Sequence, residues 1–261
     1  MAENRLPQQA GVLNLFCGKS ALAPDPDTDI KRIFSHLASS LNSVAMGIGR
    51  LKEQPDDYVM LYGPFLARAW MEVSLTALIG RLDPFRLLTI QRMQLSTNYE
   101  TAIPWKSAIR WQGDIMAKGS KDLFSPNVDV KDIHRALFGD YYDHLVWRNG
   151  IESLADAVPL DVGSRGLTEL LAIPANSFCA RKREAIGSLY SELSKSIHFE
   201  SVTPAVSLND RVTVAELLER TIRETAEAAL VCHFVPHAYD SLSANEAIHE
   251  FSNFELFEVV Q

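Results

Sequence analysis

The residues best suited to chemistry lie in one segment, residues 181–198, which reads RKREAIGSLYSELSKSIH. Apolar residues at three- and four-residue intervals predict a helix with one buried and one polar face. On the polar face Ser191, Ser194 and His198 follow at i, i+3 and i+7, so they form one stripe. An imidazole has an ordinary pKa of roughly 6.5, which suits proton transfer near neutral pH. His198 is therefore the candidate general acid–base group; alternatively, it forms with Tyr190 and Ser194 a hydrogen-bonded cluster that locks two helices together.

A charged pair lies in the apolar stretch FLARAWMEVSL. Arg68 and Glu72 are four residues apart in a predicted helix that is otherwise apolar enough to be buried, so each charge needs a partner. Either the two form an intrahelical salt bridge, or one of them orients a group on the helix that ends at His198. Lys195, three residues before the histidine, is a further cation of the same helix.

Helical periodicity predicts the elements that must position these groups. The clearest amphipathic helix covers residues 213–234. A long apolar segment, residues 58–93, is expected to kink or break at Pro64 and at the pair Asp83-Pro84. The other predicted helices cover residues 29–53, 130–148, 150–158 and about 168–173, with a short last helix within 243–260.

The fold class follows from a scarcity of strand signals. No segment alternates apolar and polar residues with β-branched enrichment, so the sequence predicts an all-α bundle. Residues 1–27 are expected to be a flexible leader, and residues 28–261 a single helical domain. Within it, residues 97–130 are rich in turn formers and predict an irregular insertion. This insertion carries Trp105 and Trp111, and either forms a surface lid or packs against the core.

The charge of the chain limits its partners. The 261 residues carry a formal net charge of −8, which disfavours attraction of the whole molecule to nucleic acid. No short helix-turn-helix with a basic second helix is present, so a sequence-specific DNA-binding regulator is not expected. Local basic clusters either hold phosphates or are solvated helix faces. They comprise Arg81, Arg86 and Arg92 in one stretch, and Arg181, Lys182 and Arg183 in another.

The cysteines indicate a reducing compartment. Cys17, Cys179 and Cys232 are far apart and show no CxxC spacing. Their odd number argues against a disulfide framework and predicts buried, structural thiols. No apolar run approaches the roughly 18 to 20 residues of a membrane helix, and the N-terminus lacks the pattern of a signal peptide. We therefore expect a cytoplasmic protein with no membrane partner.

No cofactor or metal ion is expected. Cys232, His233 and His237 are close in sequence, but Pro236 between the histidines disfavours one continuous helix that holds both ligands. The sequence contains no HExxH motif, no GK[ST] phosphate loop and no GxSxG nucleophile elbow. Metalloprotease, P-loop hydrolase and serine hydrolase chemistry are thus not predicted.

Two segments together resemble a known family. A helix reading LARAWMEVSLTALIGRLDP, with a later one reading YSELSKSIH, is similar to the HEPN-like superfamily of prokaryotic helical proteins, in branches with a Tyr-x-x-Leu-Ser-x-x-x-His signature. The resemblance covers residues 58–92 and 181–234. It implies a helical bundle that forms a homodimer and, in many members, a metal-independent endoribonuclease. Such proteins occur in phage defence, toxin–antitoxin pairs and RNA-processing complexes.

The resemblance also implies roles for single residues. In many members an Arg-x4–6-His motif provides a histidine that assists proton transfer at the ribose 2′-OH and an arginine that stabilises the phosphate. Here Ser191, Glu192 and Leu193 occupy the positions of that arginine. Arg68, Lys195 or a basic side chain across a dimer interface would replace it, while Tyr190 or Ser194 would orient the imidazole of His198.

Two functions are therefore expected from the resemblance. One is an endoribonuclease or toxin-type effector that acts on RNA by general acid–base catalysis. The other is a non-catalytic HEPN-like scaffold that binds a partner protein or ligand.

Overall fold

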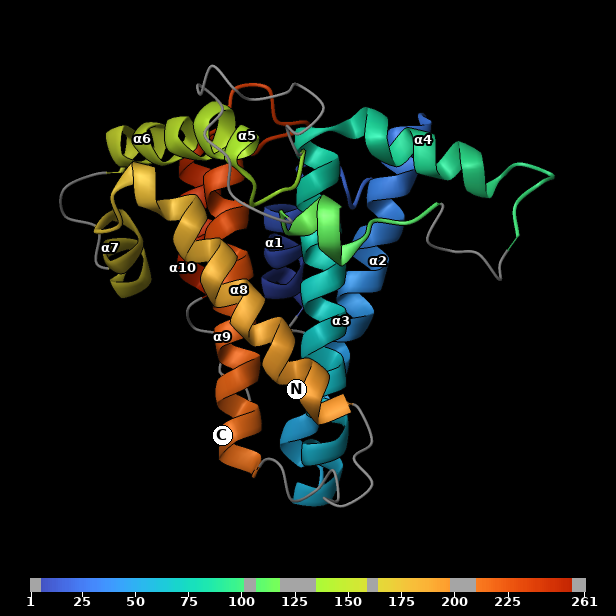
Figure 1. Cartoon of the computed structure of the whole chain (residues 1–261), viewed down its shortest axis with the longest axis vertical. Helices are drawn as coiled ribbons and strands as arrows, with labels where there is room; N and C mark the ends of the chain where they lie inside the picture. The colour runs from blue at the N-terminus through green and yellow to red at the C-terminus, as the bar shows by residue number, and fades with distance from the viewer. Residues whose placement is uncertain (1–5, 101–106, 118–134, 159–163, 198–209, 255–261) are drawn as a thin grey trace.

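A computed structural model describes residues 6–100, 107–117, 135–158, 164–197 and 210–254. In these residues the chain is helical and contains no strand, which confirms the all-α prediction (Figure 1). Shorter helical turns are Leu51–Glu53, Trp111–Ile115 and Asp143–Trp147. The α-helices are α1 (Leu6–Cys17), α2 (Asp29–Arg50), α3 (Asp56–Leu82), α4 (Pro84–Gln94), α5 (Asp140–Tyr142), α6 (Arg148–Ala157), α7 (Arg165–Leu171), α8 (Ala175–Ile197), α9 (Arg211–Cys232) and α10 (Ala244–Phe254).

Helix α3 is the centre of the fold. It packs against α9, α2, α8, α1 and α4, and in Figure 1 it lies between α2 and the pair α8–α9. Because neighbours cover it on several sides, α3 carries apolar residues around most of its circumference. Trp70, Met71 and Leu75 are at most 2% exposed. The side chain of Trp70 also donates a hydrogen bond to Thr225 of α9 at 3.0 Å, so α3 and α9 are joined by a buried polar contact as well.

The break predicted at Asp83-Pro84 is confirmed. Helix α3 ends at Leu82, and the carboxylate of Asp83 caps α4 by accepting a hydrogen bond from the backbone N–H of Arg86. Pro84 is the first residue of α4, where no backbone N–H is needed. Pro64, by contrast, lies inside α3 without ending it. Because Pro64 is buried among neighbouring helices, packing outweighs the loss of one backbone hydrogen bond there.

Helix α1 corrects the prediction of a flexible leader at residues 1–27. Residues 1–5 lie outside the described part, but Leu15, Phe16 and Cys17 are fully buried. The ring of Phe16 meets that of Trp70 edge to face, with centroids 5.4 Å apart. Helix α1 packs against α2, α3, α9 and α10. It is apolar on most sides and has no charged stripe, so helical periodicity is weak in its sequence.

The helix predicted at residues 130–148 starts later than expected. Residues 135–139 are not helical, because the N–H groups of Leu137 and Phe138 bond to the carbonyls of Asp114 and Ile115 at 2.9 and 3.1 Å. Helix α5 begins only at Asp140. Residues 130–134 lie outside the described part of the chain.

The irregular insertion predicted at residues 97–130 is described at 97–100 and 107–117. Here the backbone turns through Gly113, whose φ of 99° favours glycine. Ile115 is buried and Trp111 packs against the core. Residues 107–117 therefore pack against the core, residues 97–100 are mostly exposed, and Trp105 lies outside the described residues.

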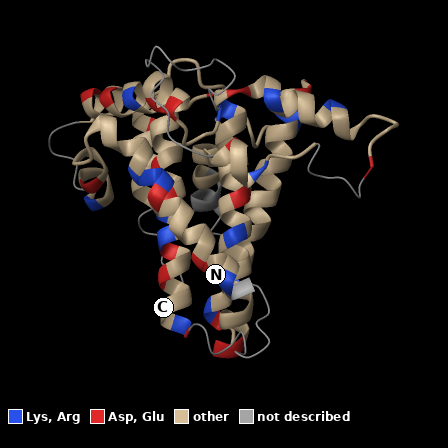
Figure 2. Ribbon diagram, in the orientation of Figure 1, with Lys and Arg blue, Asp and Glu red and all other residues tan. Residues whose placement is uncertain are grey.

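Charged residues of both signs are distributed along the helices (Figure 2). In the part of the chain that the structure describes, no helix combines the length and the apolar character required to cross a membrane.

Candidate functional site

Arg68 makes three side-chain contacts, two of which join α3 to α8. Its Nε donates to Glu72 Oε1 at 3.0 Å, within α3. Across the helix interface, Nη2 donates to the hydroxyl of Tyr190 at 2.6 Å and Nη1 donates to Ser194 Oγ at 3.1 Å. The Arg68 side chain is 25% exposed. Arg68 therefore forms the intrahelical salt bridge with Glu72 and also bonds to two side chains of α8.

The spacing of the residues explains why these side chains meet. Arg68 and Glu72 share one face of α3, and Tyr190 and Ser194 share one face of α8, because each pair is four residues apart. The two helices pack against each other. Ser194 also donates to the carbonyl of Tyr190 at 2.7 Å, and the Arg68 guanidinium lies 4.5 Å from the centroid of the Tyr190 ring. We call these four residues the Arg68 cluster.

Of the other predicted residues, Lys195 and Ser191 are not part of the Arg68 cluster. His198 lies outside the described residues, whose α8 segment ends at Ile197. Lys195 is exposed. Ser191 is exposed too, and its hydroxyl donates to the carbonyl of Gly187 one turn earlier. Only Ser194 of the predicted polar stripe is therefore joined to Arg68 in the described residues.

A cavity of about 610 Å³ opens beside the Arg68 cluster. Tyr190 and Glu72 belong to its wall, and so does Trp111, whose ring stacks on that of Tyr190 with centroids 3.7 Å apart and planes at 13°. The wall continues over α2 and α4. It has polar residues, Arg32, His36, Thr76, Gln91 and Gln94, and apolar residues, Ile33, Leu37, Val73, Leu87, Ile90, Ala108, Ile109 and Ile115.

This cavity has the chemistry to hold a planar, polar ligand. The stacked rings of Trp111 and Tyr190 offer a flat aromatic wall. His36, Gln91 and Gln94 offer hydrogen-bond donors and acceptors. Sequence reasoning did not predict Trp111, His36, Gln91 or Gln94 as residues of a site. The one signal for them was a tryptophan, Trp111, in a turn-rich stretch of the chain.

The cysteines take no part in this site. Cys17, Cys179 and Cys232 are buried and free, which confirms the prediction of structural thiols. Burial raises the pKa of Cys17 and of Cys179 to about 12. A thiol with such a pKa is a poor nucleophile near neutral pH.

His233 has a structural role beside a buried arginine. Its Nε2 lies 2.8 Å from the carbonyl of Leu15, and its Nδ1 accepts the N–H of Leu242 at 2.9 Å. The guanidinium of Arg81 lies beside both ring nitrogens, with Nη1 3.0 Å from Nε2 and Nη2 3.2 Å from Nδ1. Among the described residues, no three His, Cys, Asp or Glu side chains are grouped as metal ligands.

Two of the basic residues singled out from the sequence are buried. Arg81 is 0% exposed and donates to the carbonyls of Leu15 and Tyr239. Lys182 is 1% exposed and pairs with Glu224 at 2.6 Å and with Glu227. These two residues neither hold phosphates nor form a solvated face. The sequence did not predict the burial of Arg81 and Lys182, because the carboxylates and carbonyls that bind these side chains come from distant segments of the chain.

Comparison of the chain with protein-family models, curated proteins and solved structures finds no match.

Proposed function

We propose that the chain is a HEPN-like, metal-independent endoribonuclease that works as a cytoplasmic homodimer in a phage-defence or toxin–antitoxin system. One observation supports this most: Arg68 of α3 bonds to Tyr190 and Ser194, which precede His198 by eight and four residues. The arginine that the α8 motif lacks is thus supplied by α3.

In this proposal His198 accepts the proton of a ribose 2′-OH, whose oxygen attacks the adjacent phosphorus. Arg68 stabilises the negative charge that develops on the phosphate oxygens, and Lys195 adds a second positive charge. The 5′-oxygen leaves with a proton from the His198 of the second protomer. The products are a 2′,3′-cyclic phosphate and a 5′-hydroxyl. Tyr190 and Ser194 hold the guanidinium and the imidazole in place, and Glu72 fixes Arg68 from its own helix.

The cavity beside the Arg68 cluster gives the proposal a place for the base. A nucleobase is planar and carries donors and acceptors at its edge, and aromatic stacking contributes about 1–3 kcal/mol per base in single-stranded RNA binding. Trp111 is the aromatic side chain that would stack on it, while Gln91 or Gln94 would bond to its edge.

The test is cleavage of total tRNA and mRNA in EDTA by purified wild type, His198→Ala and Arg68→Ala. General acid–base catalysis contributes about 10²- to 10⁴-fold, so His198→Ala should lower the cleavage rate by at least about 100-fold. Arg68→Ala should do the same while circular dichroism still shows a helical fold. The products of the wild type should end in a 2′,3′-cyclic phosphate.

The matched control is Arg165→Ala. Arg165 also pairs with a glutamate four residues later, Glu169 at 2.7 Å, but it lies on α7 and is 91% exposed. Its substitution should leave cleavage unchanged. The proposal is wrong if wild type does not cleave RNA, or if His198→Ala cleaves as fast as wild type, which would indicate a contaminating nuclease.

A non-catalytic HEPN-like scaffold that binds a ligand is the second candidate. Arg68 already has three side-chain partners, as a residue that locks two helices together would. In that case the wild type cleaves no RNA, and a ligand in the cavity raises the melting temperature of wild type but not of Trp111→Ala.

A further inference from the structure

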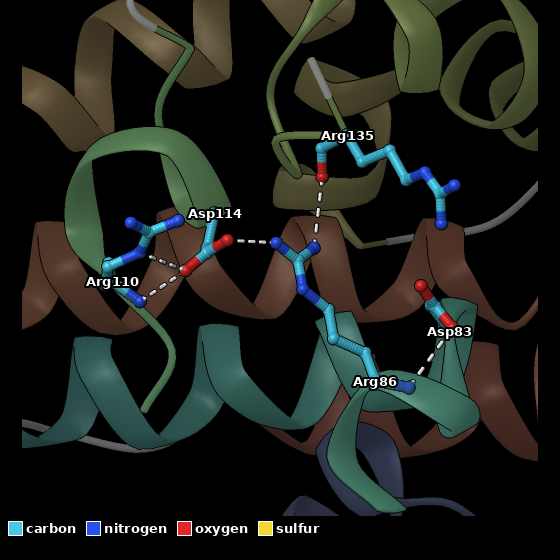
Figure 3. Close-up of polar contacts among 5 residues, drawn as sticks. All are labelled: Asp83, Arg86, Arg110, Asp114 and Arg135. Atoms are coloured by element: carbon cyan, nitrogen blue, oxygen red, sulfur yellow. Dashed lines mark hydrogen bonds and ion pairs between the residues drawn. The ribbon is translucent and has the colours of Figure 1, made fainter. Parts of the chain in front are cut away.

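A second polar cluster contains Arg86, Arg110 and Asp114, with Asp83 and Arg135 beside them (Figure 3). At its centre is Asp114, whose side chain is 9% exposed. One carboxylate oxygen, Oδ1, accepts from the guanidinium of Arg86. The other, Oδ2, accepts from the backbone N–H of Arg110 at 2.8 Å and from its Nε at 3.2 Å. Asp114 therefore fixes two arginines at once.

The frame of this cluster comes from three separate parts of the chain. Arg86 lies in the first turn of α4, and its Nη1 donates to the carbonyl of Arg135 at 3.1 Å. Arg110 and Asp114 lie on the turn through Gly113. The carbonyl of Asp114 accepts the N–H of Leu137 at 2.9 Å. Arg86 and Asp114 therefore have a structural role, and their charges are paired with each other.

Two of the arginines keep positive charge available. The Arg110 side chain is 60% exposed, and within the described residues it bonds to Asp114 through its Nε alone. Arg135 is exposed, and its side chain makes no ion pair within the described residues. In Figure 3 the side chain of Arg135 extends toward Asp83. Three arginines against two aspartates give this group a net charge of +1, on a chain whose net charge is −8.

These residues line a cavity of about 820 Å³ together with apolar side chains. The most exposed of these is Phe85 of α4, at 78%. An exposed aromatic ring beside arginines is the combination that binds nucleotides, because the ring stacks on a base while guanidinium groups bond to phosphate oxygens. The geometry points to a nucleotide-phosphate site here: Arg110 and Arg135, which lie on opposite sides of Arg86 in Figure 3, each offer a guanidinium to phosphate oxygens, Phe85 stacks on the base, and Arg86 with Asp114 holds the frame.

The phosphate could belong to a mononucleotide or to an RNA strand. A strand could reach both cavities, because Ile90, Ala108 and Ile109 line this cavity and the one beside Arg68, so the two are adjacent. The site itself does not depend on cleavage at the Arg68 cluster, since it shares no residue with that cluster.

The test is fluorescence anisotropy of a labelled oligo(A) ribonucleotide, with His198→Ala in every sample so that the strand stays intact. Arg110→Gln/Arg135→Gln should bind at least tenfold more weakly. A plot of its log affinity against log salt concentration should also be less steep, by about 0.7 for each phosphate that the variant no longer binds. Phe85→Ala should weaken binding about fivefold or more. Arg165→Gln, an exposed arginine of α7, should bind as the parent does.

Competition identifies the source of the phosphate. Displacement of the oligonucleotide by AMP identifies a mononucleotide site, and failure of AMP to displace it identifies a strand site. The inference is overturned if the parent does not bind oligo(A), or if the double variant binds like the parent. If the double variant does not fold, binding of oligo(A) by the single variant Arg135→Gln decides, because the Arg135 side chain makes no hydrogen bond or ion pair within the described residues. If Arg68→Ala loses cleavage but binds oligo(A) normally, that result does not contradict the nucleotide-phosphate site.

Discussion

Arg68 and Arg81 lie on the same helix and are used in opposite ways. Arg68 is partly exposed and bonds to side chains of α3 and α8, so its charge stays within reach of a ligand. Arg81 is fully buried and bonds mainly to backbone carbonyls and to His233. At the scale of residues, burial therefore separates groups that can take part in chemistry from groups that support the fold, and the thiols belong to the second kind.

The thiols give a prediction at this scale. With a pKa of about 12 for Cys17 and Cys179, roughly one thiol in 10⁴ is ionised at pH 8. Burial raises the pKa of Cys232 as well. Native protein should therefore react only slowly with Ellman's reagent, at the rate of global or local unfolding. In guanidinium chloride three thiols should react at once, which serves as the control. A thiol that reacts within seconds in the native protein would contradict the burial described above.

At the scale of elements, the close crossing of α3 and α9 holds the bundle together. Gly63 of α3 lies against Val214 of α9, and a Cβ built on Gly63 would be 2.2 Å from a Val214 methyl carbon. The helices can approach this closely only because residue 63 has no side chain. The same contact holds α3 in the position from which Arg68 reaches α8.

Gly63→Ala should therefore destabilise the protein, by about 1–3 kcal/mol, through overpacking. Gly49→Ala is the matched control. Gly49 is also helical, in α2, but nothing lies within 4 Å of a Cβ there. Because alanine favours helix by up to about 1 kcal/mol over glycine, this variant should be as stable as wild type or more so. Urea unfolding measures both. Equal effects of the two substitutions would show that α3 and α9 are not tightly packed at Gly63.

How far the sequence predicts these elements depends on the range of the contacts. Spacing within single helices predicted α2, α8 and α9, and it singled out Arg68, Glu72 and Ser194, whereas Tyr190 was singled out through the family resemblance. It could not find the wall of the cavity, because Trp111 meets Tyr190 only after the fold brings them together. Spacing also missed α1, because a helix that its neighbours cover on most sides shows little periodicity.

At the scale of the whole molecule, His233 and Arg81 tie the two ends of the described chain together. They bind the carbonyl of Leu15 in α1 and, near the C-terminus, the backbone of Tyr239 and Leu242. Burial, and then the neighbouring Arg81, lower the pKa of His233 well below its usual value of 6.5. The imidazole therefore stays neutral in the folded protein at pH values where it is protonated in the unfolded chain.

Stability should accordingly fall as the pH falls below about 6.5. There, unfolding takes up a proton at His233, and one proton corresponds to at most about 1.4 kcal/mol per pH unit. His233→Gln cannot take up this proton, so its free energy of unfolding should vary less between pH 5 and pH 6.5 than that of wild type. Urea unfolding at several pH values measures the difference. Parallel pH profiles of the two proteins would exclude His233 as the source.

The packing of α1 has a consequence for the order of events during synthesis. Helix α1 is made before the other described helices, yet two of its partners, α9 and α10, are the last of them to be made. The part of α1 that faces α9 and α10 therefore stays uncovered until these two helices have been translated, although α2 and α3 can cover the rest of α1 earlier. Contacts between such distant segments form slowly and expose apolar surface meanwhile. Complete burial of α1 is thus one of the last steps by which the nascent chain becomes the folded protein.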